Sequence, residues 1–469
     1  MAAGVAGKRA VLAVCSYHVQ DHPWKIPLLI PSIDPNHSFF LRPHWVEAWD
    51  LVCYAVPKSR LSSPTGGDER RAMKNLLRPC PVCEGESGHV LHHQRFAVPD
   101  DYPLPDEYDV VICASCGMVY ADTPATQADY DRFYATCSIY EQPAGARAGA
   151  TPAEDIARLE QTGALFADHI PSKDARILDV GCANGGLLQV LGRLGFRNLV
   201  GIDPSPACVE NTRNGGCQAY RGELARLPAE IGCFDAVILT SVLEHVLDVK
   251  SAISALVSVC AGNGRIFMEV PDAAGYADYL HAPFQDINTE HINHFSIASL
   301  RNLMAQFGFT PVLEKPVLVT GPSGLVFPGL EVGFERCWQI DSTFRGQMER
   351  YIDESRAMME EIDQQLRGVL ASCTEVIVWG TGQLTMKLLC DTALKDAKVV
   401  AFVDGNPVNV GRTLRGVPII GPEQLENQRA PIILATLLHT QGIRNKIASL
   451  RLTNPVVTLH TRLKRELAA

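Results

Sequence analysis

The stretch NTEHINHFS, residues 288–296, places one glutamate and two histidines close together. Histidine titrates near neutral pH, so His291 beside the carboxylate of Glu290 is a candidate catalytic base with an orienting partner. Glu290, His291 and His294 are also side chains that could ligate a metal ion. A third interpretation is ordinary polar residues at an element boundary. We favour it for His294, because Ser296 after it is a suitable N-cap for a helix.

A second stretch, ILDVGCANGGLLQVL at residues 177–191, has the pattern of a cofactor-binding loop. A predicted buried strand ends near Asp179, and a glycine-rich turn from Gly181 to Gly185 then opens a helix. Glycine lacks a Cβ atom, so the backbone can approach a ligand closely, and the helix N-terminus adds a positive field. A dinucleotide fingerprint would read GxGxxG. The GxxxG spacing with an acid before it favours a ligand with a cationic amino-acid end, namely S-adenosylmethionine.

The next predicted strand ends in Asp203, where an acid can accept both hydroxyls of a ribose, as in dinucleotide-binding folds. Glu223 follows the third strand, at a place where an adenine contact is usual. A glycine turn without a ligand is the alternative, but it does not explain an acid at the end of the second strand. The expected contacts with S-adenosylmethionine are Asp179, Gly181, Asn184, Gly185, Asp203 and Glu223.

Four cysteines form two CxxC motifs, Cys80-Pro-Val-Cys83 and Cys113-Ala-Ser-Cys116. Each tight turn can aim two thiolates at one point, and two such turns build the tetrahedral sulfur cage that Zn²⁺ accepts. Four sulfur ligands leave no open position, which predicts a structural zinc ion. The segment between the motifs is longer than in a compact zinc ribbon, so we expect it to form a hairpin. A single redox dithiol would not explain the second motif.

The candidate residues lie among predicted strands and helices that alternate from Ala175 onward. Apolar runs predict buried strands, and periods of three and four residues predict helices. This alternation predicts an α/β fold with a doubly wound parallel sheet. The predicted strands are 176–180, 198–203, 234–241 and 264–270, and the predicted helices are 185–195, 249–260 and a long amphipathic one at 346–371.

The composition limits the classes of function. The chain has 469 residues, of which 46% are hydrophobic and 20% charged, as is usual for soluble globular proteins. The net charge of −10 argues against a protein that binds the phosphate backbone of nucleic acids. Fifteen scattered cysteines do not form a disulfide framework, so we expect a cytoplasmic protein. No apolar run approaches the ~20 residues that a membrane helix needs, so no membrane partner is expected.

The cysteine quartet, LDVGCANGG, EHINHFS and the late VWGTG…VDGNPVNVGRTLRGVPI together resemble one family. It comprises three-domain, zinc-containing methyltransferases dependent on S-adenosylmethionine, among them the bacterial nucleotide-deoxysugar C-methyltransferases. The resemblance covers residues 73–469. It implies a class I methyltransferase sheet preceded by a small zinc-binding module and followed by a Rossmann-like α/β domain. It also implies a nucleotide-linked keto-sugar, or a similar carbonyl-bearing small molecule, as the substrate.

The resemblance also implies a mechanism. A carbon atom becomes nucleophilic once a proton beside a carbonyl is removed, and the enolate then takes the methyl group. Similarity to the family assigns the base to His291, a substrate-holding role to Glu290 and a place in the site to His245. A tyrosine between the zinc module and the methyltransferase domain is expected in the site, either Tyr134 or Tyr140. The sugar enzymes carry another tyrosine two residues before the glutamate, where this chain has asparagine.

The C-terminal unit has its own glycine turn after a strand, with Gly380 and Gly382, and a following strand that ends in Asp404. The place of a third glycine holds Thr385. We therefore expect no NAD here. The favoured interpretation is a degenerate Rossmann-like domain that helps to hold the substrate's nucleotide.

Three alternatives remain at this point. Methylation of oxygen in a sugar or secondary metabolite could use the same histidine. Nucleic-acid methylation is less well supported, because LTSVLEHVLD stands where enzymes acting on base amino groups carry an Asn/Asp-Pro-Pro-aromatic stretch, and no basic run appears. A binding or scaffold protein with a degenerate cofactor site is opposed by the intact acids and glycines of the loop.

Four segments follow from these patterns. Residues 1–72 have no clear period, and Met73 stands where an initiator could. The predicted order is a poorly ordered or atypical extension at 1–72, a zinc-binding module at 73–148, a methyltransferase domain at 149–318, and a linker helix with a Rossmann-like domain at 319–469.

Overall fold

The chain separates into two compact units, Met1–Ala72 and Met73–Ala469. In the first unit the described residues form a three-stranded antiparallel sheet in the order β1-β3-β2, with β1 at Leu12–Cys15, β2 at His37–Pro43 and β3 at Leu51–Pro57. The computed structural model describes residues 12–15, 37–43, 51–57, 73–137, 153–224, 227–228, 231–311, 313–316, 325–328, 341–425, 429–437 and 440–461.

The second unit begins with a five-stranded antiparallel sheet in the order β13-β7-β6-β5-β4. β5 and β6 form the hairpin that was predicted between the two CxxC motifs. β13 comes from the NTEHINHFS stretch and pairs with β7, so this sheet holds one end of the candidate site. The strands are β4 (Met73–Asn75), β5 (Ser87–Arg95), β6 (Glu107–Cys113), β7 (Val119–Asp122) and β13 (Asn293–His294).

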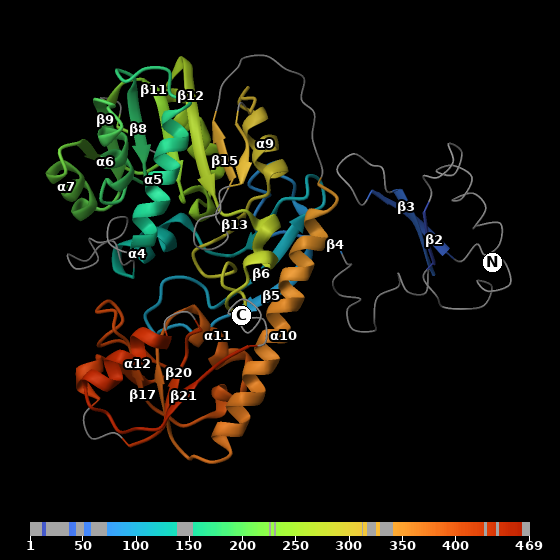
Figure 1. The fold of residues 1–469 in the computed structure, drawn as a ribbon, viewed down its shortest axis with the longest axis vertical. Helices are drawn as coiled ribbons and strands as arrows, with labels where there is room; N and C mark the ends of the chain where they lie inside the picture. The colour runs from blue at the N-terminus through green and yellow to red at the C-terminus, as the bar shows by residue number, and fades with distance from the viewer. Residues whose placement is uncertain are drawn as a thin grey trace. The chain divides into compact units, whose positions relative to one another are not determined.

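A seven-stranded sheet in the order β10-β9-β8-β11-β12-β15-β14 follows (Figure 1). The strands from β10 to β12 are parallel, as predicted, and β15 and β14 add an antiparallel edge. Its strands are β8 (Arg176–Val180), β9 (Asn198–Asp203), β10 (Gln218–Arg221), β11 (Phe234–Thr240), β12 (Cys260–Val270), β14 (Lys315–Pro316) and β15 (Leu325–Pro328).

Helices cover both faces of this sheet because its strands bury side chains on both sides. Ile177 packs with Phe166 of α5 and Leu187 of α6, whereas Leu178 packs in a separate cluster with Ile253 of α8 and Leu300 of α9. The helices and turns are α4 (Gln127–Thr136), α5 (Ala153–Ala167), α6 (Gly186–Arg193), α7 (Pro206–Asn214), η4 (Leu243–His245), α8 (Val249–Val259), η5 (Ala273–Tyr279) and α9 (Ile297–Ala305).

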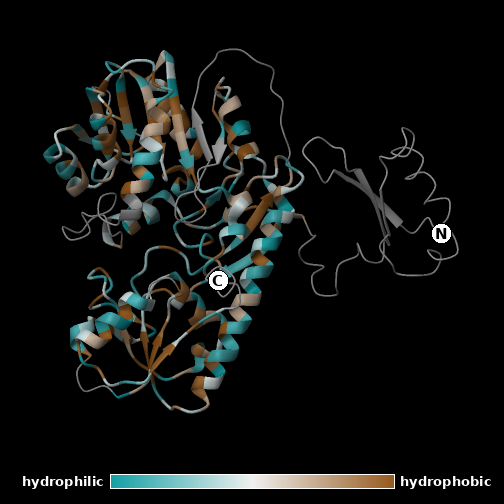
Figure 2. Ribbon diagram, in the orientation of Figure 1, coloured by the Kyte–Doolittle hydropathy of each residue, from teal (hydrophilic) through white to brown (hydrophobic). Residues whose placement is uncertain are grey.

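The C-terminal part forms a six-stranded sheet in the order β18-β19-β17-β16-β20-β21, parallel except for β18. Figure 2 shows its central strands as hydrophobic, as expected for a covered parallel sheet. The elements are β16 (Val376–Trp379), α11 (Gln383–Asp391), η6 (Ala393–Asp396), β17 (Val399–Val403), β18 (Thr413–Leu414), β19 (Val417–Ile420), η7 (Pro422–Gln424), β20 (Ile432–Leu434), α12 (Thr440–Ser449) and β21 (Val456–Thr458).

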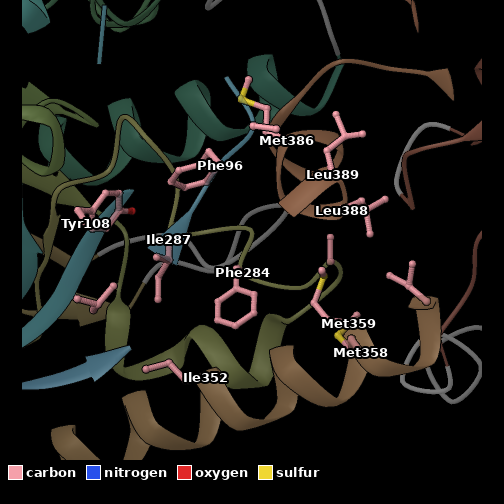
Figure 3. Close-up of a cluster of buried hydrophobic side chains, with 14 of the residues drawn as sticks. Phe96, Tyr108, Phe284, Ile287, Ile352, Met358, Met359, Met386, Leu388 and Leu389 are labelled. Atoms are coloured by element: carbon pink, nitrogen blue, oxygen red, sulfur yellow. The ribbon is translucent and has the colours of Figure 1, made fainter. Parts of the chain in front are cut away.

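The long helix predicted at 346–371 is α10, Phe344–Leu370. Its apolar face is buried from Met348 to Leu366. That face packs in one cluster with the β5–β6 hairpin, the loop around Phe284 and α11, as Figure 3 shows for Phe284 and Met359. The helix therefore joins the cysteine module to the C-terminal sheet. None of the helices in the described ranges is long and apolar enough to cross a membrane.

Candidate active site

The turn after β8 brings the backbone close to where a ligand would lie. Gly181 and Gly185 have φ values of +75° and +74°, in the left-handed region that favours glycine. A Cβ atom on Gly181 would lie 2.6 Å from Val242, and one on Gly185 would lie 2.9 Å from the side chain of Thr212. Asn184 is buried between them. Gly185 caps α6, so the first amides of that helix face the turn.

Asp179 is a buried carboxylate in an environment that would be stabilised by a bound cation. It is 1% exposed, and its Oδ1 atom has no hydrogen-bond partner among the described residues. Burial, reinforced by the charge of Asp203, raises the pKa of Asp179 to about 7. An ammonium group beside this carboxylate would relieve both effects, and S-adenosylmethionine carries one at its amino-acid end.

Asp203 ends β9 and is held by backbone amides on both sides. Its Oδ2 accepts from the amide of Ala183 at 2.9 Å, and its Oδ1 accepts from the amide of Ser205 at 2.9 Å. A carboxylate can accept several hydrogen bonds at once, which makes an acid at this strand end a suitable acceptor for ribose hydroxyls. The amide of Gly222 donates to the backbone oxygen of Asp203 at 3.2 Å, which brings the exposed Glu223 to the same edge of the sheet.

Replacing Asp203 with asparagine is expected to weaken binding of S-adenosylmethionine about tenfold to a hundredfold, because a hydrogen bond to a charged group contributes roughly 1.5–3 kcal/mol. Titration calorimetry measures this change. Asp174→Asn is the control, since Asp174 is exposed and pairs with Arg197. An unchanged dissociation constant in a folded Asp203→Asn variant would remove Asp203 from the binding site.

His245 and His291 meet edge to face, with ring centroids 4.8 Å apart and an interplanar angle of 79°. Nδ1 of His245 lies 3.1 Å from the backbone oxygen of Glu290. A carbonyl only accepts, so Nδ1 carries the proton and Nε2 has the lone pair. Burial lowers the pKa of His245 to about 4 and that of His291 well below its usual range. Both rings are therefore neutral at pH 7. Tyr134 lies edge to face against His245, with centroids 6.3 Å apart.

The carboxylate near these rings is that of Glu244, which the sequence interpretation missed. Oε1 of Glu244 is 3.8 Å from Nε2 of His245, and Oε2 has no partner among the described residues. Burial raises the pKa of Glu244 to about 8. The signal was present, because Glu244 directly precedes His245, just past the fourth strand of this sheet in the chain, β11.

The expected contact between the side chains of Glu290 and His291 is not formed in the described part of the chain. No hydrogen bond joins the Glu290 carboxylate to His291 in the described part of the chain, and burial raises the pKa of Glu290 to about 7. Nor do Glu290, His291 and His294 converge as metal ligands. Within the described ranges, the histidine-containing group whose ligand atoms converge, within 4.8 Å, is Glu244, His245 and His291.

The loop that carries His291 is shaped by Asn288. Its Oδ1 accepts from the backbone amides of Glu290 and His291, each at 2.8 Å. His294 is fully buried, with Nδ1 3.5 Å from the hydroxyl of Tyr276, which agrees with the structural role predicted for it. Ser296 caps α9 as predicted.

Arg78 and Asn293 fix the η4 turn that carries His245. The guanidinium of Arg78 donates to Leu247 O at 2.8 Å and to Oδ1 of Asn293 at 2.9 Å. The amide of Asn293 donates to Leu243 O at 3.0 Å and to Val246 O at 2.7 Å. A buried guanidinium and a buried amide that share these bonds make a rigid support.

The histidine pair lies next to the glycine turn. β11 pairs with β8 up to Leu239 opposite Val180, so both strands end at the same edge of the sheet. Val242, which follows β11, packs directly on Gly181. His245 is three residues further on, in η4. Strand ends of an open α/β sheet are where such folds bind ligands. Tyr140, the alternative to Tyr134, lies outside the described residues.

The four cysteines converge. Sγ of Cys80 lies 3.5 Å from Sγ of Cys116, and the same distance separates Cys83 and Cys113. All four sulfurs lie within 4.8 Å of one another. A tetrahedron of Zn–S bonds of about 2.3 Å has sulfurs about 3.8 Å apart, so the four thiolates fit a metal ion. Gly117 after the second pair has a φ of +76°, as the tight turn requires.

Residues 152–314 match the family model described as a methyltransferase domain. The chain contains a methyltransferase domain. Its sheet is the class I fold of the enzymes that use S-adenosylmethionine. Residues 372–456 match a second model, described as C2185-like, N-terminal.

Similar proteins match the same region. A ubiquinone biosynthesis O-methyltransferase from Methylocella silvestris is 38% identical over 103 residues, which are 21% of this chain and 40% of the relative. Another from Xylella fastidiosa is 30% identical over 152 residues, 30% of this chain and 58% of the relative. The chain thus spans about half the length of these relatives. A 1,6-didemethyltoxoflavin-N1-methyltransferase from Burkholderia thailandensis is 17% identical, with a TM-score of 0.37, over 47% of this chain and 98% of that one.

Proposed function

We propose that this protein transfers a methyl group from S-adenosylmethionine to a carbon atom beside a carbonyl group of a small molecule, a nucleotide-linked keto-sugar or a similar acceptor. The observation that carries the proposal is the pair of neutral histidines, His245 and His291, of which His245 lies three residues after Val242, the residue that packs on the turn that would bind the methyl donor. Glu244 and Tyr134 border the pair and could hold polar groups of the acceptor.

In this proposal His291 is the base. Its Nδ1 atom is buried without a partner among the described residues, and the ring is neutral at pH 7, the form that accepts a proton. The ring of His245, oriented by the backbone oxygen of Glu290, keeps a lone pair on Nε2 for a hydroxyl of the acceptor. Removal of the proton leaves a nucleophilic carbon in the acceptor. Glu290 keeps the substrate-holding role that the family resemblance suggests.

The donor would be held by the residues of the glycine turn. Asp179 would take the ammonium group, Asp203 the ribose and Glu223 the adenine edge. S-adenosylmethionine supplies an electrophilic methyl group when bound there. In the cysteine module we propose a structural zinc ion, because four thiolates leave no position open for a substrate.

Methylation of oxygen is the second candidate. The relatives named ubiquinone biosynthesis O-methyltransferases match the domain that carries the donor site, which favours it. A neutral histidine can take a proton from a hydroxyl as well as from carbon. The two candidates differ in whether a carbon–hydrogen bond is broken before the methyl group arrives.

Solvent exchange distinguishes them. The protein is incubated in D₂O with nucleotide-linked keto-sugars and with hydroxylated aromatic acceptors, with and without S-adenosylmethionine. Carbon methylation predicts a product in which a methyl group replaces one hydrogen of the acceptor and, without the donor, deuterium at the carbon beside the carbonyl. A methylated product without any exchange supports oxygen as the acceptor. No methylated product across the panel contradicts the proposal.

A further inference from the structure

The η4 turn places a buried acid beside the proposed base. Glu244 is 1% exposed, and its backbone oxygen accepts from the amide of Ile292 at 2.9 Å. Ile292 directly follows His291, so this bond fixes the two segments against each other. One carboxyl oxygen of Glu244 and one ring nitrogen each of His245 and His291 lie within 4.8 Å of one another. Both rings are partly exposed, so a small molecule that reaches them also reaches Glu244.

Polar atoms at this point of convergence have unused hydrogen-bonding capacity. Oε2 of Glu244 has no partner among the described residues, and neither has Nδ1 of His291. Oε1 of Glu244 faces Nε2 of His245 at 3.8 Å, which is too long for a hydrogen bond. Buried polar atoms in native proteins are nearly always paired. Unpaired ones that converge at a partly open site therefore mark a place for the polar groups of a ligand.

Of the three groups that converge, Glu244 is the one able to donate a proton. The proton of His245 is on Nδ1, which faces a backbone oxygen, and His291 has to accept a proton in the proposed reaction. Asn288 is engaged within its own loop, where its side chain binds three backbone groups. A carboxylic acid has one O–H to donate. A donor already in place stabilises the negative charge that develops on a carbonyl oxygen.

The groups around Glu244 keep a proton on it at neutral pH. Burial is the largest cause and raises the pKa of Glu244 to about 8, and the carboxylate of Glu269 near the end of β12 adds to this. The backbone amide of Glu244 and the guanidinium of Arg158 on α5 act in the opposite direction. Arg158 pairs with Glu269 at 2.9 Å. The two histidines and Tyr276 of η5 also face Glu244, and all three are neutral at pH 7.

We propose that Glu244 is a second catalytic residue, which in its acid form gives its proton to the carbonyl oxygen of the acceptor. His291 takes the proton of the neighbouring carbon, and the electron pair of that bond forms a carbon–carbon double bond. The carbon then takes the methyl group as the carbon–sulfur bond of the donor breaks, and the electron pair of that bond stays on sulfur. The oxygen returns its proton to Glu244, and His291 releases the other proton to solvent. This role rests on the function proposed above.

Deuterium exchange into a nucleotide-linked keto-sugar, measured on the full chain without the methyl donor, tests the role. We expect Glu244→Met to lower the exchange rate about 10²–10³-fold, as when one donor to a developing oxyanion is removed. Glu244→Gln, whose amide still donates a hydrogen bond, should exchange about tenfold faster than Glu244→Met. Glu160→Gln is the control, since Glu160 is exposed on α5 and pairs with Arg193. Calorimetry with S-adenosylmethionine shows that each variant is folded.

The pH dependence separates a catalytic acid from a structural residue. The acid form is required, and its fraction decreases as the pH rises through about 8. The wild-type exchange rate should therefore fall about tenfold for each further pH unit. Glu244→Gln should lack this fall, because an amide does not ionise there.

Infrared spectra of the free proteins locate the proton without any substrate. The difference between wild type and Glu244→Gln should contain the band of a protonated carboxyl group at pH 7, and this band should disappear as the pH rises through about 8. No such band at pH 7 overturns the inference, whatever the activity.

Equal exchange by wild type and Glu244→Met, or an alkaline fall that persists in Glu244→Gln, overturns the role. Loss of exchange in Tyr134→Phe but not in Glu244→Met assigns the donor to Tyr134 instead. Loss of one metal ion per chain in Glu244→Met, by elemental analysis, shows a metal site in place of an acid. Methylation without exchange in the wild type also overturns the role. A wild type that neither exchanges nor methylates refutes the proposed function itself, and this role with it.

Discussion

Replacing His291 with asparagine is expected to reduce methyl transfer by about 10²–10⁴-fold, the range that a positioned base contributes. Asparagine has similar bulk and can still donate a hydrogen bond, but it cannot accept a proton at neutral pH. Burial keeps the wild-type ring neutral at pH 7 and lowers its proton affinity, so its role as the base rests on its position and not on its pKa. The variant should still bind S-adenosylmethionine, because the proposed donor contacts lie outside the loop that carries His291, on the turn after β8 and at the end of β9. Initial rates and calorimetry with the donor measure the two effects.

His93→Asn is the control for this variant. His93 is half exposed on β5, and it pairs with Asp109 away from the histidine site. It should keep wild-type activity. The His291→Asn variant should also lose the exchange of deuterium into the acceptor. A variant that is defective only in binding the methyl donor would keep this exchange. A near-normal rate in His291→Asn would show that another group removes the proton.

Cys113→Ser is expected to release the metal ion and unfold the cysteine module. Structural zinc contributes on the order of 10 kcal/mol to the folding of zinc-finger peptides, which is comparable to the whole unfolding free energy of a domain, about 5–15 kcal/mol. The module also holds the segment of the candidate site, since β13 pairs with β7 and Arg78 supports the η4 turn. Loss of the metal should therefore lower both the melting temperature and the rate.

Elemental analysis for zinc and a thermal melt measure this outcome. The control is Cys233→Ser, because Cys233 is exposed and lies outside the quartet. It should retain the metal and the wild-type melting temperature. A purified wild-type protein without zinc, or a Cys113→Ser variant with an unchanged melt, would contradict the structural role of the quartet.

Local pattern was sufficient for the strands, the glycine turn and the long helix. β8 and β9 run over the predicted residues because these apolar runs are short and bounded by turn residues, which favours a buried strand over a helix. The turn at Gly181 and Gly185 was also predicted from the sequence, since both glycines adopt the left-handed conformation that favours this residue. The CxxC pairs were also predictable, because two residues between the cysteines allow a tight turn to direct both thiolates at one metal ion.

The partners within the candidate site were decided by the tertiary structure. His291 and Glu290 are neighbours in sequence, yet the carboxylate near the histidine pair belongs to Glu244, and Asn288 is occupied in shaping the loop. Adjacent residues on an irregular loop point in directions that only the surrounding packing sets. β13 and the Arg78 network provide that packing, and their pairs are far apart in the chain.

A cavity of about 700 Å³ at the carboxyl edge of the C-terminal sheet shows the same division. The sequence predicted a glycine turn, a strand-end acid, Asp404, and a role for this domain in holding the substrate's nucleotide, but it did not show which residues enclose a space beside the loop of His291. That space exists because the strand order reverses next to β16 and because α10 and Gln383 bring the second sheet against the 287–291 loop. Short-range patterns specify turns and strands, whereas a site made of several elements depends on contacts that form only when the whole unit packs.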